Sequence, residues 1–451
     1  AAEEAAAEEI VIEEKTAPDI SIETNAQALP AEGVLSGDTR PARLRALTAA
    51  WNTNWERRTI EYDEILSGGP PRDGIPSIDA PQFVDFDSAA EWLADNEPVI
   101  ALVINGDARA YPLQVLTWHE IANDTVGGVP VVVTFCPLCN SALVFDRRVG
   151  DEVYEFGVSG LLRNSDLIMY DRTTESMWQQ FNGEGIVGDH AGDQLTFLAS
   201  SLVSFADFRA AFPEGQVLSR ETGFSRRYGQ NPYEGYDPIG SNPFLNRGPV
   251  DGRLAAVEPV ITVSLPGEAI DVAYPLDILS EMGVINDTRG SQDLAVFFAP
   301  GTSSALGSAV IAEAEDVGAT GVFDPALNGQ KLTFQKDGEQ IVDLQTGSVW
   351  NVLGQAVEGE LAGDGSFSGN IEVDATDTTN PGTPSDPVGD DIGDFAGVIG
   401  GPGGNAVAGG TFVENFTEEL DNEIEYGVFV LDPVSYTHLT LPTMLALCRS
   451  R

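Results

Sequence analysis

The sequence predicts an α+β protein with mostly antiparallel strands and few helices, built from two duplicated halves. Short apolar runs rich in β-branched and aromatic residues recur between residues 99 and 170, and Gly, Asp or Asn separates them. This pattern is typical of short strands joined by tight turns. Only the stretches 113–123 and 204–212 in this half have apolar residues at helical spacing. Many strands with few helices favour the α+β class.

The two halves are predicted from a set of residues that returns 163 positions later. Tyr111-Pro112-Leu113 returns as Tyr274-Pro275-Leu276, and Asn123-Asp124-Thr125 returns as Asn286-Asp287-Thr288. Further along, four residues return in the same spacing, namely Asp171, Thr174, Ser176 and Trp178 as Asp343, Thr346, Ser348 and Trp350. Such self-similarity indicates an internal duplication. Residues common to both copies are expected to serve the fold, and those in one copy only are better candidates for chemistry.

The predicted elements alternate along the first half. The expected strands are the apolar runs 99–104, 129–135, 142–145, 153–158 and 167–170. In the first helical stretch, Val115, Leu116, His119 and Ala122 lie on neighbouring faces. The run 142–145 follows the preceding strand after a short gap and ends near Gly150, so it is predicted to be the return strand of a hairpin.

Composition divides the chain into segments. Residues 1–39 are expected to be an acidic disordered leader, since they are rich in Ala and Glu and show no apolar stretch of a signal peptide. Residues 40–240 form the first half, which holds the cysteine pair. Residues 241–361 form the degenerate second copy.

The remaining sequence departs from this composition. Residues 362–433 are interpreted as a Gly/Asp-rich linker and remnant with few large apolar residues. Residues 434–451 lose the acidic character and resemble translated sequencing adapter, so we interpret them as an artefact. His438 and Cys448 are therefore set aside as site candidates.

The charge of the chain restricts its partners. Among 451 residues, 71 are Asp or Glu and 23 are Lys or Arg, which gives a net charge of -48. Such a surface repels nucleic acid and anionic membranes, so we expect neither as a partner. It fits adaptation to high salt, where repulsion is screened, and also an acidic protein that is secreted or held at the cell surface. No apolar run is long enough for a transmembrane segment.

The pair Cys136-Pro137-Leu138-Cys139 is the strongest chemical candidate. It can bind a soft metal ion, cycle between dithiol and disulfide, or form a structural disulfide. A thioredoxin-like fold would place a long helix after the pair. The predicted return strand 142–145 stands there instead, which makes that architecture the weaker interpretation.

His119 is the predicted third ligand of this pair. Met282 takes its place in the second copy, where Ala299 and Thr302 replace the cysteines, so all three groups are lost together. Two thiolates and an imidazole suit zinc or copper and leave one coordination position open. Six further residues are candidates for a pocket or for supporting carboxylates and ligands, namely Glu120, Asp166, Met169, Arg172, Gln179 and Gln180. His190, in a loop-like stretch, is interpreted as a surface residue.

Many of these residues carry a family resemblance. The segments involved are 51–55, 68–83, 108–113, 118–120, 123–124, 134–146, 157–160, 165–180 and 228–236. Together they resemble the domain-of-unknown-function family numbered 3179 (DUF3179) over about residues 51–361. The resemblance implies no particular activity, because the family's function is unassigned.

We therefore favour a protein that binds one transition-metal ion, zinc or copper, through Cys136, Cys139 and His119. One alternative is a thiol–disulfide oxidoreductase that uses the same cysteines, with His119 lowering a thiol pKa. The other is a non-enzymatic binding module in which the pair forms a structural disulfide. The sequence identifies no substrate and no partner.

Overall fold

The computed structural model describes residues 34–236, 238–241, 243–246, 252–265, 270–327 and 330–357. Five further strands are described by their backbone only, namely β30 (Ser366–Glu372), β31 (Asp391–Gly400), β32 (Ala406–Phe412), β33 (Val428–Val430) and β34 (Leu445–Arg449). The rest of the predicted linker 362–433 and of the predicted artefact 434–451 lies outside the described residues. So do residues 1–33 of the predicted leader.

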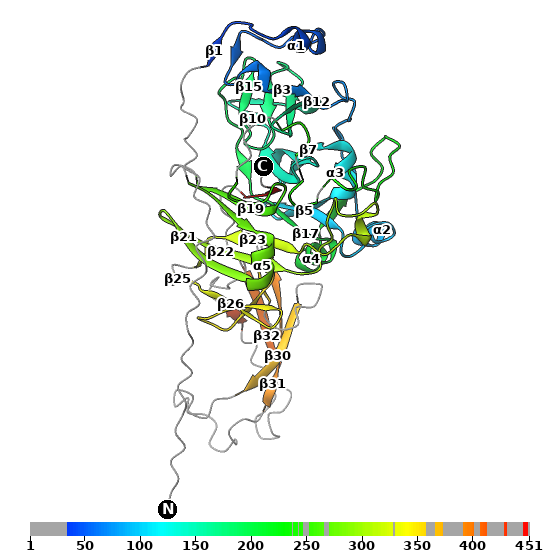
Figure 1. The fold of residues 1–451 in the computed structure, drawn as a ribbon. Coiled ribbons are helices and arrows are strands. Elements are labelled where there is room, and N and C mark those ends of the chain that lie inside the picture. The colour runs from blue at the N-terminus through cyan, green and yellow to red at the C-terminus, as the bar shows by residue number, and fades with distance from the viewer. Residues whose placement is uncertain are drawn as a thin grey trace, which may run out of the picture.

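Antiparallel β-structure predominates, as predicted (Figure 1). Within the described ranges the α-helices are five and short, namely α1 (Ala42–Leu47), α2 (Phe86–Ala90), α3 (Leu113–His119), α4 (Phe205–Ala211) and α5 (Leu276–Met282). Two 3₁₀ turns accompany them, η1 (Tyr62–Glu64) and η2 (Ile311–Glu313). None of these helices has the length and apolar character needed to cross a bilayer. The predicted α+β class with few helices is confirmed.

Three large sheets form the body of the protein, and the first of them lies toward the top of Figure 1. In spatial order it contains β1 (Leu35–Ser36), β2 (Arg57–Arg58), β15 (Gly185–Val187), β14 (Met177–Gln179), β13 (Asp166–Asp171), β12 (Phe156–Arg163) and β3 (Ile65–Ser67). Strand β1 falls within the predicted disordered leader. That prediction is therefore wrong for residues 35–36, which pair with β2.

The second and third sheets complete the body. The second contains β20 (Ile270–Pro275), β19 (Pro259–Leu265), β34, β9 (Ser141–Asp146), β8 (Val129–Cys136) and β7 (Ile121–Val126), with β16 (Phe197–Leu198) beside β9. The third contains β21 (Val284–Arg289), β22 (Gln292–Ala299), β23 (Ala319–Phe323), β17 (Ser201–Ser204), β5 (Pro98–Ile104), β6 (Asp107–Pro112), β18 (Gln216–Leu218) and β4 (Phe83–Val84). Strands β18 and β6 run parallel.

The remaining strands form small sheets. They are β10 (Arg148–Val149) with β11 (Glu152–Val153), β24 (Ala326–Leu327) with β25 (Gln330–Lys331), and the group β26 (Phe334–Asp337), β27 (Gln340–Asp343), β28 (Val349–Trp350) and β29 (Ala356–Val357). Backbone strands β30 to β33 form a fourth small sheet within the stretch predicted to be a linker.

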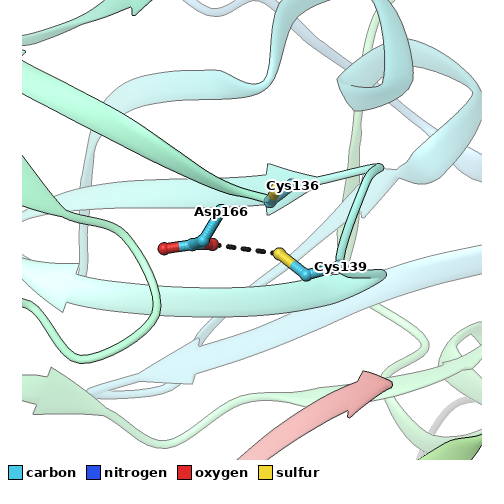
Figure 2. A group of neighbouring side chains, drawn as sticks. All are labelled: Cys136, Cys139 and Asp166. Carbon is cyan, nitrogen blue, oxygen red and sulfur yellow. Dashed lines mark hydrogen bonds between the residues drawn. The ribbon is translucent and has the colours of Figure 1, made fainter. Parts of the chain in front are cut away.

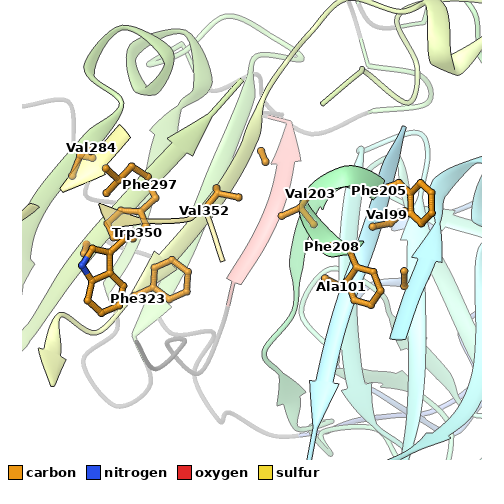
Figure 3. Packing of buried hydrophobic residues seen from close by; sticks show 14 of the residues in the cluster. Val99, Ala101, Val203, Phe205, Phe208, Val284, Phe297, Phe323, Trp350 and Val352 are labelled. Atoms are coloured by element: carbon orange, nitrogen blue, oxygen red, sulfur yellow. The ribbon is translucent and has the colours of Figure 1, made fainter. Parts of the chain in front are cut away.

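The two halves of the chain contribute to the same sheets. In the third sheet, β5 and β6 of the first half lie with β21 to β23 of the second, and in the second sheet β7 to β9 lie with β19 and β20. One apolar core accordingly joins Val99 and Phe205 of the first half to Phe297 and Trp350 of the second (Figure 3). Burial of this shared core stabilises the halves together.

The residues that recur in sequence also make the same contacts. The side chain of Asn123 donates to the carbonyl of Phe156 at 2.8 Å and accepts from its N–H at 2.9 Å, and Asn286 does the same for Phe334 at 2.7 and 2.9 Å. The recurring Asp, Thr, Ser and Trp form the same turn around the Asp carboxylate in both copies. Trp178 Nε1 donates to Asp171, and Trp350 Nε1 donates to Asp343. These polar side chains satisfy backbone and indole groups inside the fold.

The first predicted helix is shorter than expected. It ends at His119, since Glu120 adopts a left-handed conformation with φ 60°. Residues 121–123, predicted to be helical, belong to strand β7. The apolar spacing extended the predicted helix beyond its end because the apolar residues at 121 and 122 fit a buried strand as well as a helix.

Replacing Asn123 with Ala tests the two hydrogen bonds between its side chain and the backbone of Phe156. The change strands a buried N–H and a buried carbonyl of Phe156, so we expect the free energy of unfolding to fall by about 3 kcal/mol. Asn286→Ala is the matched control. Its side chain is exposed, water can replace it, and we expect a loss of less than about 1 kcal/mol. Urea unfolding of both variants measures the difference, and equal losses would contradict it.

Candidate metal centre

The cysteine pair lies in the loop of a hairpin. Strand β8 ends at Cys136, which pairs with Ser141 at the start of β9, and residues 137–140 form the turn. Asn140 takes the left-handed conformation, φ 49°, that closes it. Both cysteines are free thiols and buried. The predicted hairpin is confirmed, and the long helix of a thioredoxin-like fold does not follow the pair.

Asp166 approaches this loop from another sheet. It begins β13, directly after the two-residue turn of Asn164 and Ser165, whose φ values of 50° and 65° are those of a type I′ turn. Its carboxylate points to the cysteine loop in Figure 2, where Cys139 Sγ donates to Asp166 Oδ1 at 2.9 Å. The donor atoms of Cys136, Cys139 and Asp166 all lie within 4.8 Å of one another.

Two glutamines support the centre. Gln179 Nε2 donates to the carboxylate of Asp166, which also accepts from the N–H of Phe181 at 3.0 Å. Gln180 accepts from Ser141 Oγ at 2.7 Å and donates to Thr134 Oγ1 at 2.8 Å, so it braces both strands of the hairpin. Hydrogen bonds of this kind fix the orientation of groups that bind a metal.

Two other residues predicted from the sequence, Met169 and Arg172, do not belong to the group of three donors. Met169 is fully buried in the apolar cluster that also contains both cysteines, which is the position of a core residue. Arg172 donates to Tyr170 Oη at 2.7 Å and to Asp73 at 3.2 Å. These contacts hold segment 73–79 against β13, so Arg172 acts on the fold around the centre.

His119 is not part of this group of three donors. Its Nδ1 lies 2.7 Å from the carbonyl of Pro76, and its Nε2 lies 2.7 Å from Tyr228 Oη. Both ring nitrogens are therefore engaged at the end of α3. The group that could hold a metal ion contains Asp166, and His119, which the sequence predicted as the third ligand, lies outside it.

Glu120 is a buried acid close to the centre. Its left-handed conformation is one that favours glycine, and Gly283 (φ 71°) has the corresponding position after α5. Burial raises the pKa of Glu120 to about 8, with repulsion from Asp166 adding to the effect. The carboxyl group is therefore mostly protonated at neutral pH. Tyr233 Oη donates to it over 3.5 Å.

The electrostatics of the cysteines follow from this acidic surrounding. Burial raises the pKa of Cys136 well above its ordinary value, and Cys139, Asp166 and Glu120 raise it further. The groups acting on this thiol are all acids, which disfavour a thiolate. A cation bound among them would reverse this balance, because it stabilises both thiolates and the carboxylate.

Comparison with known proteins gives one match. A search of curated proteins and of solved structures finds nothing significant. The family model described as "Protein of unknown function (DUF3179)" matches residues 72–378. It covers most of the range over which the sequence resembles that family, and it includes both cysteines, Asp166 and Glu120. The chain therefore belongs to the DUF3179 family.

Proposed function

We propose that this protein binds a single transition-metal ion through Cys136, Cys139 and Asp166. The observation that carries the proposal is the meeting of two thiols and a carboxylate within 4.8 Å in a buried place. Two sulfur donors and one oxygen donor suit zinc, a borderline ion that accepts both. Copper(I) prefers sulfur and imidazole, so replacement of His119 by Asp166 in the donor set favours zinc of the two ions expected from the sequence.

The geometry and charge of the site support this choice. Zinc bonds of about 2.3 Å to sulfur and about 2.0–2.2 Å to oxygen require donors roughly 3.5 Å apart, so a small contraction of the group is enough. The thiol protons leave when the ion binds. Three protein ligands leave a fourth position open, as in zinc sites that carry out catalysis.

The thiol–disulfide alternative has less physical support. A reactive cysteine of that class is a partly exposed thiolate in an electropositive environment. Here both sulfurs are buried, and the surrounding acids raise the pKa of Cys136. Reversible oxidation of the pair remains an outcome that the experiment below distinguishes.

We also propose that the two halves descend from one duplicated unit. The support is the recurrence of contacts as well as of residues, with Asn123 and Asn286 bracketing a phenylalanine backbone in the same way. Only the first half retains the cysteines, so a duplicated ancestor with one surviving centre explains why its donors are lost together in the second.

Metal analysis of untagged protein tests the proposed function. We expect about one zinc ion per chain, and at least about a 100-fold loss of zinc affinity in Cys136→Ser, Cys139→Ser and Asp166→Asn, because each removes a ligand. His119→Gln is the control and retains the ion. Loss of zinc in His119→Gln with retention in Asp166→Asn would support the Cys-Cys-His set. A metal-free protein with a reversible dithiol would support the oxidoreductase.

The stability of metal-free protein should depend on pH through Glu120. The folded chain holds a proton on this group up to about pH 8, whereas the unfolded chain releases it near pH 4.5. Stability from this group is therefore complete below pH 4.5 and falls as pH rises to 8, by on the order of 4 kcal/mol. Chemical denaturation at several pH values measures the slope. Glu120→Gln should remove this part of it, and an unchanged slope would contradict the assignment.

A further inference from the structure

The proposed ligands are closed off from solvent. Cys136, Cys139 and Asp166 are 2%, 3% and 0% exposed. An ion can reach them only if a covering segment moves. The segment 222–236, here called the strap, lies beside the end of α3 and contacts His119 and Glu120 through two tyrosines.

The first tyrosine fastens the strap to His119. The carbonyl of Pro76 can only accept, so His119 Nδ1 carries the proton and donates to it, and Nε2 accepts from Tyr228 Oη. Tyr228 Oη in turn accepts from Thr222 Oγ1 at 2.6 Å. The imidazole of His119 thus joins Pro76 to the strap through a chain of hydrogen bonds in which each donor is defined.

The middle of the strap is fixed at both sides. Trp118 Nε1 donates to the carbonyl of Gln230 at 3.1 Å. Asn231, which is buried, donates from Nδ2 to the carbonyl of Leu306 at 2.8 Å and from its backbone N–H to Ala309 at 3.0 Å. Residues 228–231 are therefore anchored to α3 and to the loop before η2.

The second tyrosine makes a weaker contact, to Glu120. Tyr233 Oη reaches Glu120 over 3.5 Å, at the outer limit of a hydrogen bond. Burial raises the pKa of Tyr233, and Glu120 and Cys136 raise it further. The carbonyl of Glu120 accepts from the N–H of Phe135 at 2.8 Å, and Phe135 directly precedes Cys136, so the contact of Tyr233 lies beside the thiols. Glu234 and Gly235 beyond it are exposed. Gly235, with φ 76°, follows this contact and permits backbone rotation.

We propose that the strap is the gate of the centre, with Tyr233 and Glu120 as its latch and His119 with Tyr228 as its anchor. Release of Tyr233 exposes the thiols while residues 228–231 stay in place. The inference rests on the proposed metal site for its purpose, but the opening itself concerns the thiols alone. It assigns to His119 a positioning role for the strap.

The rate of thiol modification in metal-free protein tests the gate. Methyl methanethiosulfonate, a small uncharged reagent, is applied under native conditions, and peptide mass spectrometry follows Cys136 and Cys139 separately from Cys448. We expect Tyr233→Phe to react about five-fold faster, since one hydrogen bond of the closed state is lost. Tyr274→Phe is the matched control. It removes a tyrosine–carboxylate hydrogen bond of 2.8 Å, to Asp287, in the second half and should react at the wild-type rate.

The dependence on urea separates gate opening from unfolding. Opening of the strap exposes little surface, so the accelerated reaction of Tyr233→Phe should depend only weakly on urea, whereas reaction through global unfolding depends on it steeply. Equal rates in Tyr233→Phe and Tyr274→Phe, or a steep urea dependence of the acceleration, would overturn the gate. If the protein binds no zinc but Tyr233→Phe still reacts faster, with only a weak dependence on urea, the metal site is overturned and the gate stands.

Discussion

The hydrogen bond from Cys139 to Asp166 is the contact on which the rest of the centre depends. It brings a thiol and a carboxylate to 2.9 Å in a place where both are buried. Burial and Asp166 raise the pKa of Glu120, and burial, Cys139, Asp166 and Glu120 raise that of Cys136. Burying several acids without a compensating cation is unfavourable unless they keep their protons. Glu120 and Cys136 therefore favour their protonated forms, and a cation bound among the proposed ligands would change this balance.

Sequence patterns predicted the backbone of this site well. The alternation of β-branched runs and turn residues placed the hairpin around Cys136 and Cys139, and the lack of a helical pattern after the pair argued against a thioredoxin-like fold. These features depend on near neighbours in the chain. The shared core of the two halves could not be predicted in this way, because a repeat indicates two copies without indicating which strands pair.

The donor set shows where such patterns fail. The repeat comparison linked His119 to the cysteines because all three are lost together, but the helix ends at Glu120 and the ring of His119 contacts Pro76 and Tyr228. Asp166 was a candidate only as a supporting carboxylate, because a chain with 71 acidic residues gives any one of them little weight. Tyr228 and Tyr233 were not singled out. For Glu120, a signal was present in the sequence. This residue stands where the second copy has Gly283, at a position where the backbone favours glycine.

The location of the three donors has a mechanical consequence. Cys136 and Cys139 belong to the hairpin of the second sheet, whereas Asp166 begins a strand of the first. An ion held by all three would link these two sheets, which also meet through apolar side chains and through hydrogen bonds such as those between Asn123 and Phe156. The resistance of the two sheets to sliding past each other would then depend on the concentration of the ion. The rigidity of the whole first half would change with that concentration.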